Sequence, residues 1–407
     1  MEIIRTKVCL LSDHHVCINP RLWKEAFLYE KLGYNVTILT MWQSADLLQR
    51  DKELLKGHAI DYKTYLNLIP GEANSVSRFF YRARRRLASE LQKRVKMSSP
   101  WAISHAPELL VKKAVEEKAN HYSAHLEAAF WAGRELIKNG KRVSFDFEDW
   151  YSRDYLTADR AVNLLAATEA FALQHGVFCT AASRSMASAL QDAYKITKPV
   201  TVVYNSFPDE ELMDVDVTSS KSKSATIRMV WTSRTVGPQR GLETLVAALQ
   251  FVQTPVELHI IGKCAAGYEE VLRTNWKYSN HQLVFHGFVL HDELLPAIAT
   301  YDLGLAIEQY EADSRNTTVT NKILQYLHAG LAVLATDTKG QQEIASHFPD
   351  AVYLVKPNEP EQWAQQIERF AKQGFTINKQ QQQTIYQQYF SWAVQEQQLK
   401  QLITNAI

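Results

Sequence analysis

The chain has 407 residues, more than one ordinary hydrophobic core accommodates, so we expect two domains. Hydrophobic residues make up 46% of it, charged residues 22%, and the net charge is +1, which excludes a protein that attracts nucleic acid through its overall field. The segment 1–7 leads into a strand rather than a signal sequence, and no apolar run approaches the roughly 20 residues that cross a bilayer. The four cysteines lack metal-ligand spacing, so we expect reduced thiols and a cytoplasmic protein.

Residues 1–208 predict one doubly wound, Rossmann-like domain. Short apolar runs typical of buried parallel strands recur along this part of the chain, and helical patterns separate them. The expected helices are 22–32, which ends at Gly33, and 161–175. The expected strands are Val8–Ser12, Val36–Thr40, Val143–Phe147, Val177–Ala181 and Val200–Tyr204.

Residues 209–225 are acidic and then rich in Ser, Lys and Thr, which predicts an interdomain linker. A second Rossmann-like domain is expected over 226–378, with a helix at 241–249 whose leucines fall on one face. The apolar residues in the glutamine-rich tail, 379–407, predict helices that cross back to the N-terminal domain. The strands expected in the second domain are Ile227–Ser233, Val256–Ile261, Asp302–Ile307 and Leu331–Ala335.

Unusual polar residues follow the strands of the second half, where doubly wound sheets bind their ligands. Arg234 and Arg240 follow the first of these strands, and Gly262 and Lys263 follow the second. Two arginines ahead of a helix N-terminus suit a diphosphate, because guanidinium groups match phosphate oxygens and the helix dipole favours negative charge. The alternative is a pair of surface cations that bind Glu243.

A second set of candidate ligand contacts follows the strand at 302–307. Residues 317, 321 and 325 have the spacing of one helical face, so we expect all three to point at one ligand. The alternative is that the polar residues cap and solvate a helix, and that Glu308 is an exposed loop carboxylate. The candidates are Glu308, Asn316, Thr317, Thr318, Asn321, Lys322 and Gln325.

Five motifs follow one another in the second half: Ser233-Arg234, Arg240-Gly241, His259–Gly262, Val284–Val289 and the run from Asp302 to Asp337. Taken in order, these motifs resemble the nucleotide-sugar glycosyltransferases of the GT-B fold, most closely the family 4 (group 1) enzymes. The resemblance implies two doubly wound α/β domains that face a central cleft, with the donor bound by the C-terminal domain. It further implies retention of the anomeric configuration, and Arg234 and Arg240 would bind the donor diphosphate and stabilise the leaving group. No cofactor is expected, and no metal, because no Asp-x-Asp pair stands in the donor half.

The chain departs from this family at its Glu-x7-Glu motif, where Thr317 and Gln325 stand. Gln325 can still bond a ribose diol, whereas Thr317 supplies no negative charge near the anomeric centre. Two alternatives therefore stay open: a catalytically silent sugar-nucleotide-binding protein or subunit, and a sugar-nucleotide epimerase of the same fold. A phosphorylase would need a pyridoxal-bearing lysine that no motif marks. An NAD-dependent dehydrogenase is disfavoured because no GxGxxG follows an expected strand.

The first half offers fewer candidates. The segment His121-Tyr-Ser-Ala-His125 resembles the family's His-x-His element, which implies a catalytic place for His125 beside the reacting sugar; a lone buried histidine is the alternative. Asn19 and Arg21 follow the first strand, and Glu148 and Asp149 end the strand at 143–147. These four are candidates for acceptor binding, although turn formation and helix capping explain them as well.

The segment Arg78–Lys96 carries eight basic residues against one Glu, with aromatic and aliphatic residues interleaved. A solvated helix face is one interpretation, and peripheral binding to anionic lipid at the inner face of the plasma membrane is the other. Nucleic acid fits less well, because no recognition motif accompanies the charge. The expected partners are a UDP- or GDP-sugar donor and a glycan or lipid-linked hydroxyl acceptor.

Overall fold

The computed structural model describes residues 6–154, 157, 159–208, 226–289, 291–309, 312–373 and 378–407. The chain divides into two compact units, the first made of residues 1–203 and 396–407 and the second of residues 204–395. The expected linker, residues 209–225, lies outside the described residues. The domain limits 1–208, 226–378 and 379–407 remain proposals. No described helix is both long enough and apolar enough to cross a membrane.

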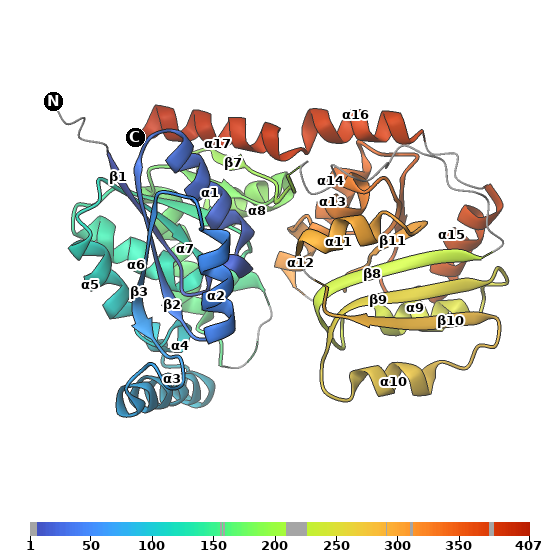
Figure 1. Ribbon diagram of the computed structural model, residues 1–407, viewed down its shortest axis with the longest axis horizontal. Helices are drawn as coiled ribbons and strands as arrows, with labels where there is room; N and C mark the ends of the chain where they lie inside the picture. The colour runs from blue at the N-terminus through green and yellow to red at the C-terminus, as the bar shows by residue number, and fades with distance from the viewer. Residues whose placement is uncertain are drawn as a thin grey trace. The chain divides into compact units, whose positions relative to one another are not determined.

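The first unit is a seven-stranded sheet in the order β3-β2-β1-β4-β5-β6-β7, and every neighbouring pair of strands is parallel (Figure 1). Its strands are β1 (Lys7–Leu11), β2 (Asn35–Trp42), β3 (Ile60–Asn67), β4 (His121–His125), β5 (Val143–Phe147), β6 (Cys179–Ala181) and β7 (Val200–Val202). Its helices are η1 (Val16–Ile18), α1 (Pro20–Lys31), α2 (Ala45–Leu54), α3 (Ser75–Val95), α4 (Pro100–Ile103), α5 (Pro107–Glu116), α6 (Leu126–Lys138), η2 (Tyr151–Arg153), α7 (Val162–His175) and α8 (Arg184–Tyr194).

Both faces of this sheet are covered by helices, which explains the continuous apolar runs of its strands. Side chains alternate along β1: Val8 and Leu10 join one apolar cluster, and Cys9 and Leu11 join another. The first cluster includes residues of α1 and also Leu399 and Ile403 of α17 (Trp392–Ala406). The second includes residues of α5, α6, α7 and α8.

The second unit is a six-stranded parallel sheet in the order β10-β9-β8-β11-β12-β13. Trp231 and Leu258 of this sheet pack in one apolar cluster with Leu245 and Trp363 of the covering helices. The strands are β8 (Ile227–Val236), β9 (Val256–Cys264), β10 (His281–Gly287), β11 (Leu303–Ala306), β12 (Ala332–Thr336) and β13 (Val352–Val355). The helices are α9 (Leu242–Leu249), α10 (Tyr268–Asn275), α11 (His291–Ile298), α12 (Asp313–Thr317), α13 (Asn321–His328), α14 (Lys339–Ala345), α15 (Pro360–Gln373) and α16 (Lys379–Tyr389).

One expectation about the second unit is wrong: residues 317, 321 and 325 do not lie on one helix. The chain ends α12 at Thr317 and starts α13 at Asn321, and Thr318 and Thr320 between them have extended backbones. Four successive β-branched residues, 317–320, disfavour a continuous helix. The hydroxyls of Thr317 and Thr318 instead donate to the carbonyl of Ser314.

Candidate functional site

The first candidate site lies where β8 and β9 end. Gly262 has a φ of +146°, and a Cβ there would stand 1.9 Å from the carbonyl oxygen of Ser233. The pairing register shifts between Thr232 and Thr235, and Thr235 then pairs with Lys263. The close approach that only glycine permits therefore holds Lys263 beside the irregular stretch of β8 that carries Arg234.

Three cations share this edge of the second unit's sheet. Arg234 and Lys263 are exposed, and neither makes a side-chain hydrogen bond or ion pair with any residue in the described part of the chain. The half-buried Arg240 donates a long hydrogen bond, 3.4 Å, from Nη1 to the hydroxyl of Ser233. Gly241 then starts α9 without a side-chain cap, which leaves the first N–H groups of that helix open. Cations with open donor capacity beside a helix N-terminus suit a phosphate-bearing ligand.

A buried ion pair lies at the ends of the neighbouring strands. The Lys322 ammonium stands 2.5 Å from Glu308 and 5.5 Å from the centre of the Trp231 ring. Both charged side chains are largely buried, with exposed fractions of 11% and 6%. The backbone N–H of Glu308 donates to the hydroxyl of Thr336, so Glu308 is held at the carboxyl end of β11 beside β12. Glu308 is therefore not the exposed loop carboxylate of the alternative interpretation.

Tyr326 fixes the position of helix α13, and the neighbouring Gln325 is available to bind a ligand. The Tyr326 hydroxyl accepts a hydrogen bond of 2.9 Å from the backbone N–H of Thr232 at the end of β8. Its ring packs over Gly304, where a Cβ would come within 2.3 Å of it. Gln325 is largely buried, yet its side-chain amide forms no hydrogen bond with any residue that the structure describes. The amide is not among the fully buried groups that lack a partner, so it reaches the surface and could bond a ligand there.

Four of the other expected donor contacts form hydrogen bonds within the protein: Asn316, Thr317, Thr318 and Asn321. The Asn316 carbonyl oxygen accepts from the backbone N–H of Lys339, and that of Asn321 accepts from the side chain of Asn205. The Thr317 hydroxyl donates to the carbonyl of Asp313 at 2.9 Å. These contacts shape the loop between α12 and α13.

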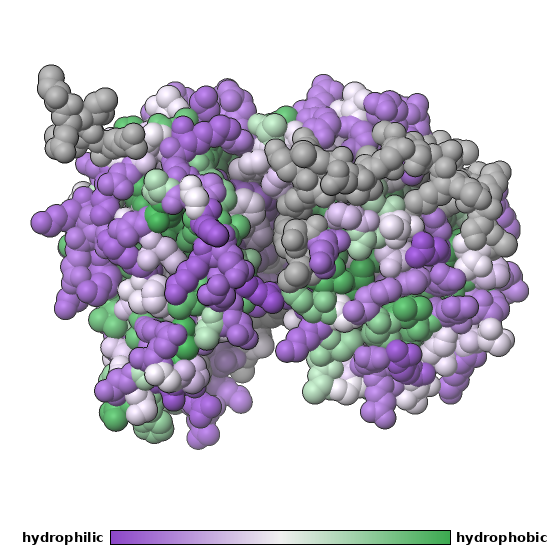
Figure 2. All heavy atoms as spheres, in the orientation of Figure 1, coloured by the Kyte–Doolittle hydropathy of each residue, from purple (hydrophilic) through white to green (hydrophobic). Residues whose placement is uncertain are grey.

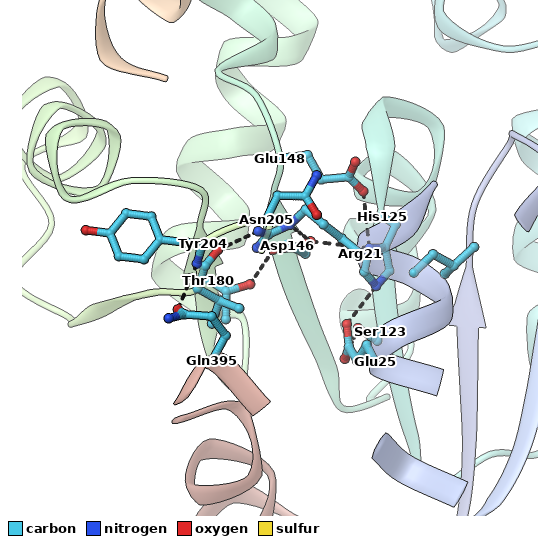
Figure 3. Close-up of polar contacts among 12 residues, drawn as sticks. Arg21, Glu25, Ser123, His125, Asp146, Glu148, Thr180, Tyr204, Asn205 and Gln395 are labelled. Carbon is cyan, nitrogen blue, oxygen red and sulfur yellow. Dashed lines mark hydrogen bonds and ion pairs between the residues drawn. The ribbon is translucent and has the colours of Figure 1, made fainter. Parts of the chain in front are cut away.

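A second group of polar residues surrounds His125 in the first unit (Figure 3). His125 is fully buried, and its Nε2 lies 2.7 Å from Glu25, whereas Nδ1 lies 3.3 Å from Glu148 and 3.4 Å from Asp146. Burial lowers the pKa of His125, but the charge of Glu25 and the bonds with Asp146 and Glu148 outweigh it, and the pKa is raised well above 6.5. The raised pKa favours the imidazolium form of His125, which has carboxylates on both sides of the ring.

Arg21 and Asp146 form a buried two-point ion pair beside this imidazolium. Arg21 Nε lies 2.7 Å from one carboxylate oxygen and Nη2 lies 2.5 Å from the other, while Nη1 donates to the Val203 carbonyl. The Thr180 hydroxyl donates to Asp146 as well. Burial raises the pKa of Asp146, but the charge and hydrogen bonds of Arg21 hold it well below its usual value. Each guanidinium nitrogen of Arg21 is thus already bonded to another group of the protein.

Glu148 is the most accessible member of the group, with 17% of its side chain exposed. The Asn19 amide donates to it at 2.8 Å, and the Asn19 carbonyl oxygen caps α1 by accepting from Leu22. Asp149, next in the chain, is half-buried. The structure thus brings together four of the expected residues: Asn19, Arg21, His125 and Glu148. Glu25 was not predicted from the sequence, although it stands four residues after Arg21 on the buried face of α1, which was a usable signal.

His125, Asp146 and Glu148 also offer three ligand atoms within 4.8 Å of one another, which is a possible metal geometry. The chemistry of the group argues against this use. A metal ion would have to displace the proton of His125 and compete with Arg21 for Asp146. The residues present fit a cluster of two cations and three carboxylates that pair with one another better.

Comparisons with known proteins identify the fold and one domain of the chain. Residues 226–373 match the family model described as glycosyl transferases group 1. Anabaena HepE, solved with UDP and glucose, is 16% identical with a TM-score of 0.69, over 98% of this chain and 100% of that one. Sucrose-phosphate synthase from Thermosynechococcus elongatus is 13% identical with a TM-score of 0.70, over 98% and 99% of the two chains. No curated protein gives a significant match.

The two parallel sheets and their structural neighbours therefore show a GT-B fold, and the family match shows a glycosyl transferase domain, so the expected fold and enzyme class are confirmed. Its group 1 glycosyl transferase domain occupies residues 226–373, in the second unit.

Proposed function

We propose that this glycosyltransferase moves a sugar from a nucleoside-diphosphate sugar, a UDP- or GDP-sugar, to a hydroxyl of a glycan or lipid-linked acceptor. The group formed by Arg234, Arg240 and Lys263 carries this proposal, because these cations have donor capacity that the described protein leaves unused. HepE, which shares the fold, was solved with UDP and with UDP-glucose, and this supports a uridine nucleotide.

The proposed chemistry is electrostatic. Negative charge grows on the diphosphate as the bond to the sugar breaks, and fixed cations aimed at it stabilise that state. These side chains would do the work of a metal ion, so we propose transfer without a metal and with retention at the anomeric carbon. The Gln325 amide would bond the ribose hydroxyls, and the Glu308–Lys322 pair would contact the donor sugar or its phosphate.

Unit 1 is proposed to bind the acceptor through Glu148, with Asn19 orienting that carboxylate. Both ring nitrogens of His125 are engaged by carboxylates, so the structure favours a positioning role over the direct catalytic role expected from the sequence. Arg21 likewise acts on the acceptor site through Asp146, whereas Asp149 stays a candidate for direct contact.

One observation favours a second candidate, a catalytically silent binder of sugar nucleotides. Thr317 stands where related enzymes place a carboxylate, and its hydroxyl is bonded to its own helix. A silent binder would keep the phosphate cations and lose turnover.

A nucleotide-sugar screen separates these candidates. Melting temperatures would be measured with UDP-, GDP-, CMP- and ADP-sugars, and release of free nucleotide would then be followed with glycan and lipid-linked acceptors. We expect one nucleotide class to stabilise the protein by about 2.7 kcal/mol at a ligand concentration 100 times its Kd, and to be released with acceptor present. Stabilisation without turnover would favour the silent binder, and no stabilisation by any sugar nucleotide would contradict both.

A further inference from the structure

The helix α3 has an apolar surface that no described residue of the protein covers. Val76 and Phe79 are each 74% exposed, Leu87 is 62% exposed and Phe80 is 56% exposed. These residues belong to the helix at the lower edge of the first unit, where apolar side chains reach the surface (Figures 1 and 2). Burying large apolar side chains is strongly favourable, so a row of exposed ones indicates a binding surface.

The apolar residues and the cations of α3 are arranged in adjoining rows. Val76, Phe80, Ala83 and Leu87 follow one another at spacings of four, three and four residues, which makes one helical stripe. Arg82, Arg86 and Lys93 follow at four and seven residues, which makes a second row beside it. All three cations are exposed, and none forms a hydrogen bond or ion pair with another described residue.

The opposite side of α3 fixes the helix to the first unit. Ala88 and Gln92 are buried there. Arg84 donates to the carbonyl of His105 at 2.6 Å and pairs with Glu108 at 2.6 Å. Its guanidinium also stacks 4.6 Å from the centre of the Trp101 ring. Because this side is anchored, the apolar stripe and the free cations are presented outward together.

We propose that α3 is a docking surface for an anionic lipid bilayer. A helix that lies in the membrane interface needs apolar side chains for the acyl boundary and cations at the level of the headgroups. The stripe and the cation row of α3 supply both on one exposed side. A nucleic acid would bind the cations but would leave Phe79 and Phe80 exposed. An acidic protein partner would bind α3 in the absence of any lipid. None of these residues belongs to the donor or acceptor groups described above.

Vesicle flotation tests this proposal. The full chain would be mixed with vesicles of phosphatidylcholine alone, and with vesicles of phosphatidylcholine and phosphatidylglycerol. Two variants probe the surface: Phe79→Ser with Phe80→Ser, and Arg82→Gln with Arg86→Gln. Two matched controls change exposed residues elsewhere: Phe251→Ser with Val271→Ser, and Lys52→Gln with Lys112→Gln.

The chain is expected to float only with the anionic vesicles, and less at high salt. Removing two cations should weaken partitioning about 25-fold, since each contributes roughly fivefold, and the phenylalanine variant should lose roughly tenfold or more. The controls should bind as the wild type does. All variants should melt normally and bind sugar nucleotides, which separates a failure of docking from a failure of the proposed transfer. Absence of flotation at low salt, equal losses in the controls, or binding to RNA in place of vesicles would overturn the proposal.

Discussion

Gly262 lies so close to Ser233 that a Cβ atom would stand 1.9 Å from the Ser233 carbonyl oxygen. This contact joins the ends of β8 and β9, and it is compatible only with glycine at a φ of +146°. Lys263 follows Gly262 in the chain and Arg234 follows Ser233. The contact therefore sets the distance between two cations that we assign to the donor diphosphate.

Replacing Gly262 with Ala should destroy this arrangement. Over-packing against backbone should cost about 1–3 kcal/mol of folding free energy, and the displaced strand ends should lose affinity for UDP or GDP. Gly267→Ala is the matched control, because Gly267 also has a positive φ but no atom within 4 Å of its Cβ position. Urea denaturation and nucleotide titration would measure both effects. Nucleotide affinity retained in Gly262→Ala would argue against the proposed role of the contact.

His125→Gln should change how stability depends on pH. The pKa of His125 is raised well above 6.5 in the folded protein, so its stabilisation is fully present below the unfolded pKa and is lost as pH rises through the folded pKa. The wild type should therefore lose stability on the alkaline side of neutrality. The variant should be less stable near pH 6 by about 3–5 kcal/mol, because the buried Glu25 and Asp146 and the partly exposed Glu148 lose their shared cation, and its alkaline decline should be smaller.

His121→Gln provides the control for this experiment, since His121 is equally buried on the same strand. Burial, aided by the charge of Arg142, lowers the pKa of His121 to about 3, so the ring is neutral in the folded protein above that pH. Its replacement should leave the alkaline decline intact. An unchanged pH profile in His125→Gln would mean that His125 is neutral.

Arg21→Ala should destabilise the first unit strongly. It leaves the buried Asp146 carboxylate without its two-point partner, which costs about 3–5 kcal/mol. Arg94→Ala, which removes an exposed pair with Glu90, should cost no more than about 1 kcal/mol. Equilibrium unfolding in urea would compare them. Equal, small losses would show that the buried pair contributes no more than a surface pair.

Gln325→Ala tests the proposed ribose contact. Wild-type protein should bind UDP more tightly than 2′-deoxy-UDP, roughly 2- to 10-fold, which corresponds to one neutral hydrogen bond. The variant should lose this preference, whereas Gln282→Ala, an exposed position on β10, should keep it. Calorimetric titration of both nucleotides gives the comparison. A variant that still discriminates between them would remove Gln325 from the donor site.

The sequence predicted several buried strands, because strands covered on both faces are continuous apolar runs. It missed the buried central strand β4, His121–His125, which contains two histidines and a serine. The strand β5 has the expected bounds, Val143–Phe147. The sequence did not predict β3, Ile60–Asn67, since this edge strand mixes polar and apolar residues and is only partly buried. It also placed a continuous helix across residues 317–325, where helical spacing was outweighed by the β-branched residues between α12 and α13.

Residues of the candidate site could be predicted where their position after a strand end is sufficient to indicate a role. Arg234, Arg240 and Lys263 were predicted because polar residues that follow buried strands lie at the binding edge of a doubly wound sheet, and their role in donor binding stays a proposal. The partners of His125 were not, because its contact with Glu25 joins residues 100 positions apart, and only the packing of α1 on the sheet brings them together. The ion pair between Arg21 and Asp146 was not predicted for the same reason, because the two residues are far apart in the sequence.

The most direct test of the central claim is a titration of UDP, UMP and uridine into the wild type and Arg234→Ala, with the same series for guanosine ligands. Lys277→Ala, an exposed cation elsewhere in the second unit, is the control. We predict that the wild type and the control gain affinity with each added phosphate. Arg234→Ala should lose about 1.5–3 kcal/mol of the diphosphate's binding free energy and little of the nucleoside's. Diphosphate affinity unchanged in Arg234→Ala, or lowered equally in Lys277→Ala, would contradict the assignment of this site.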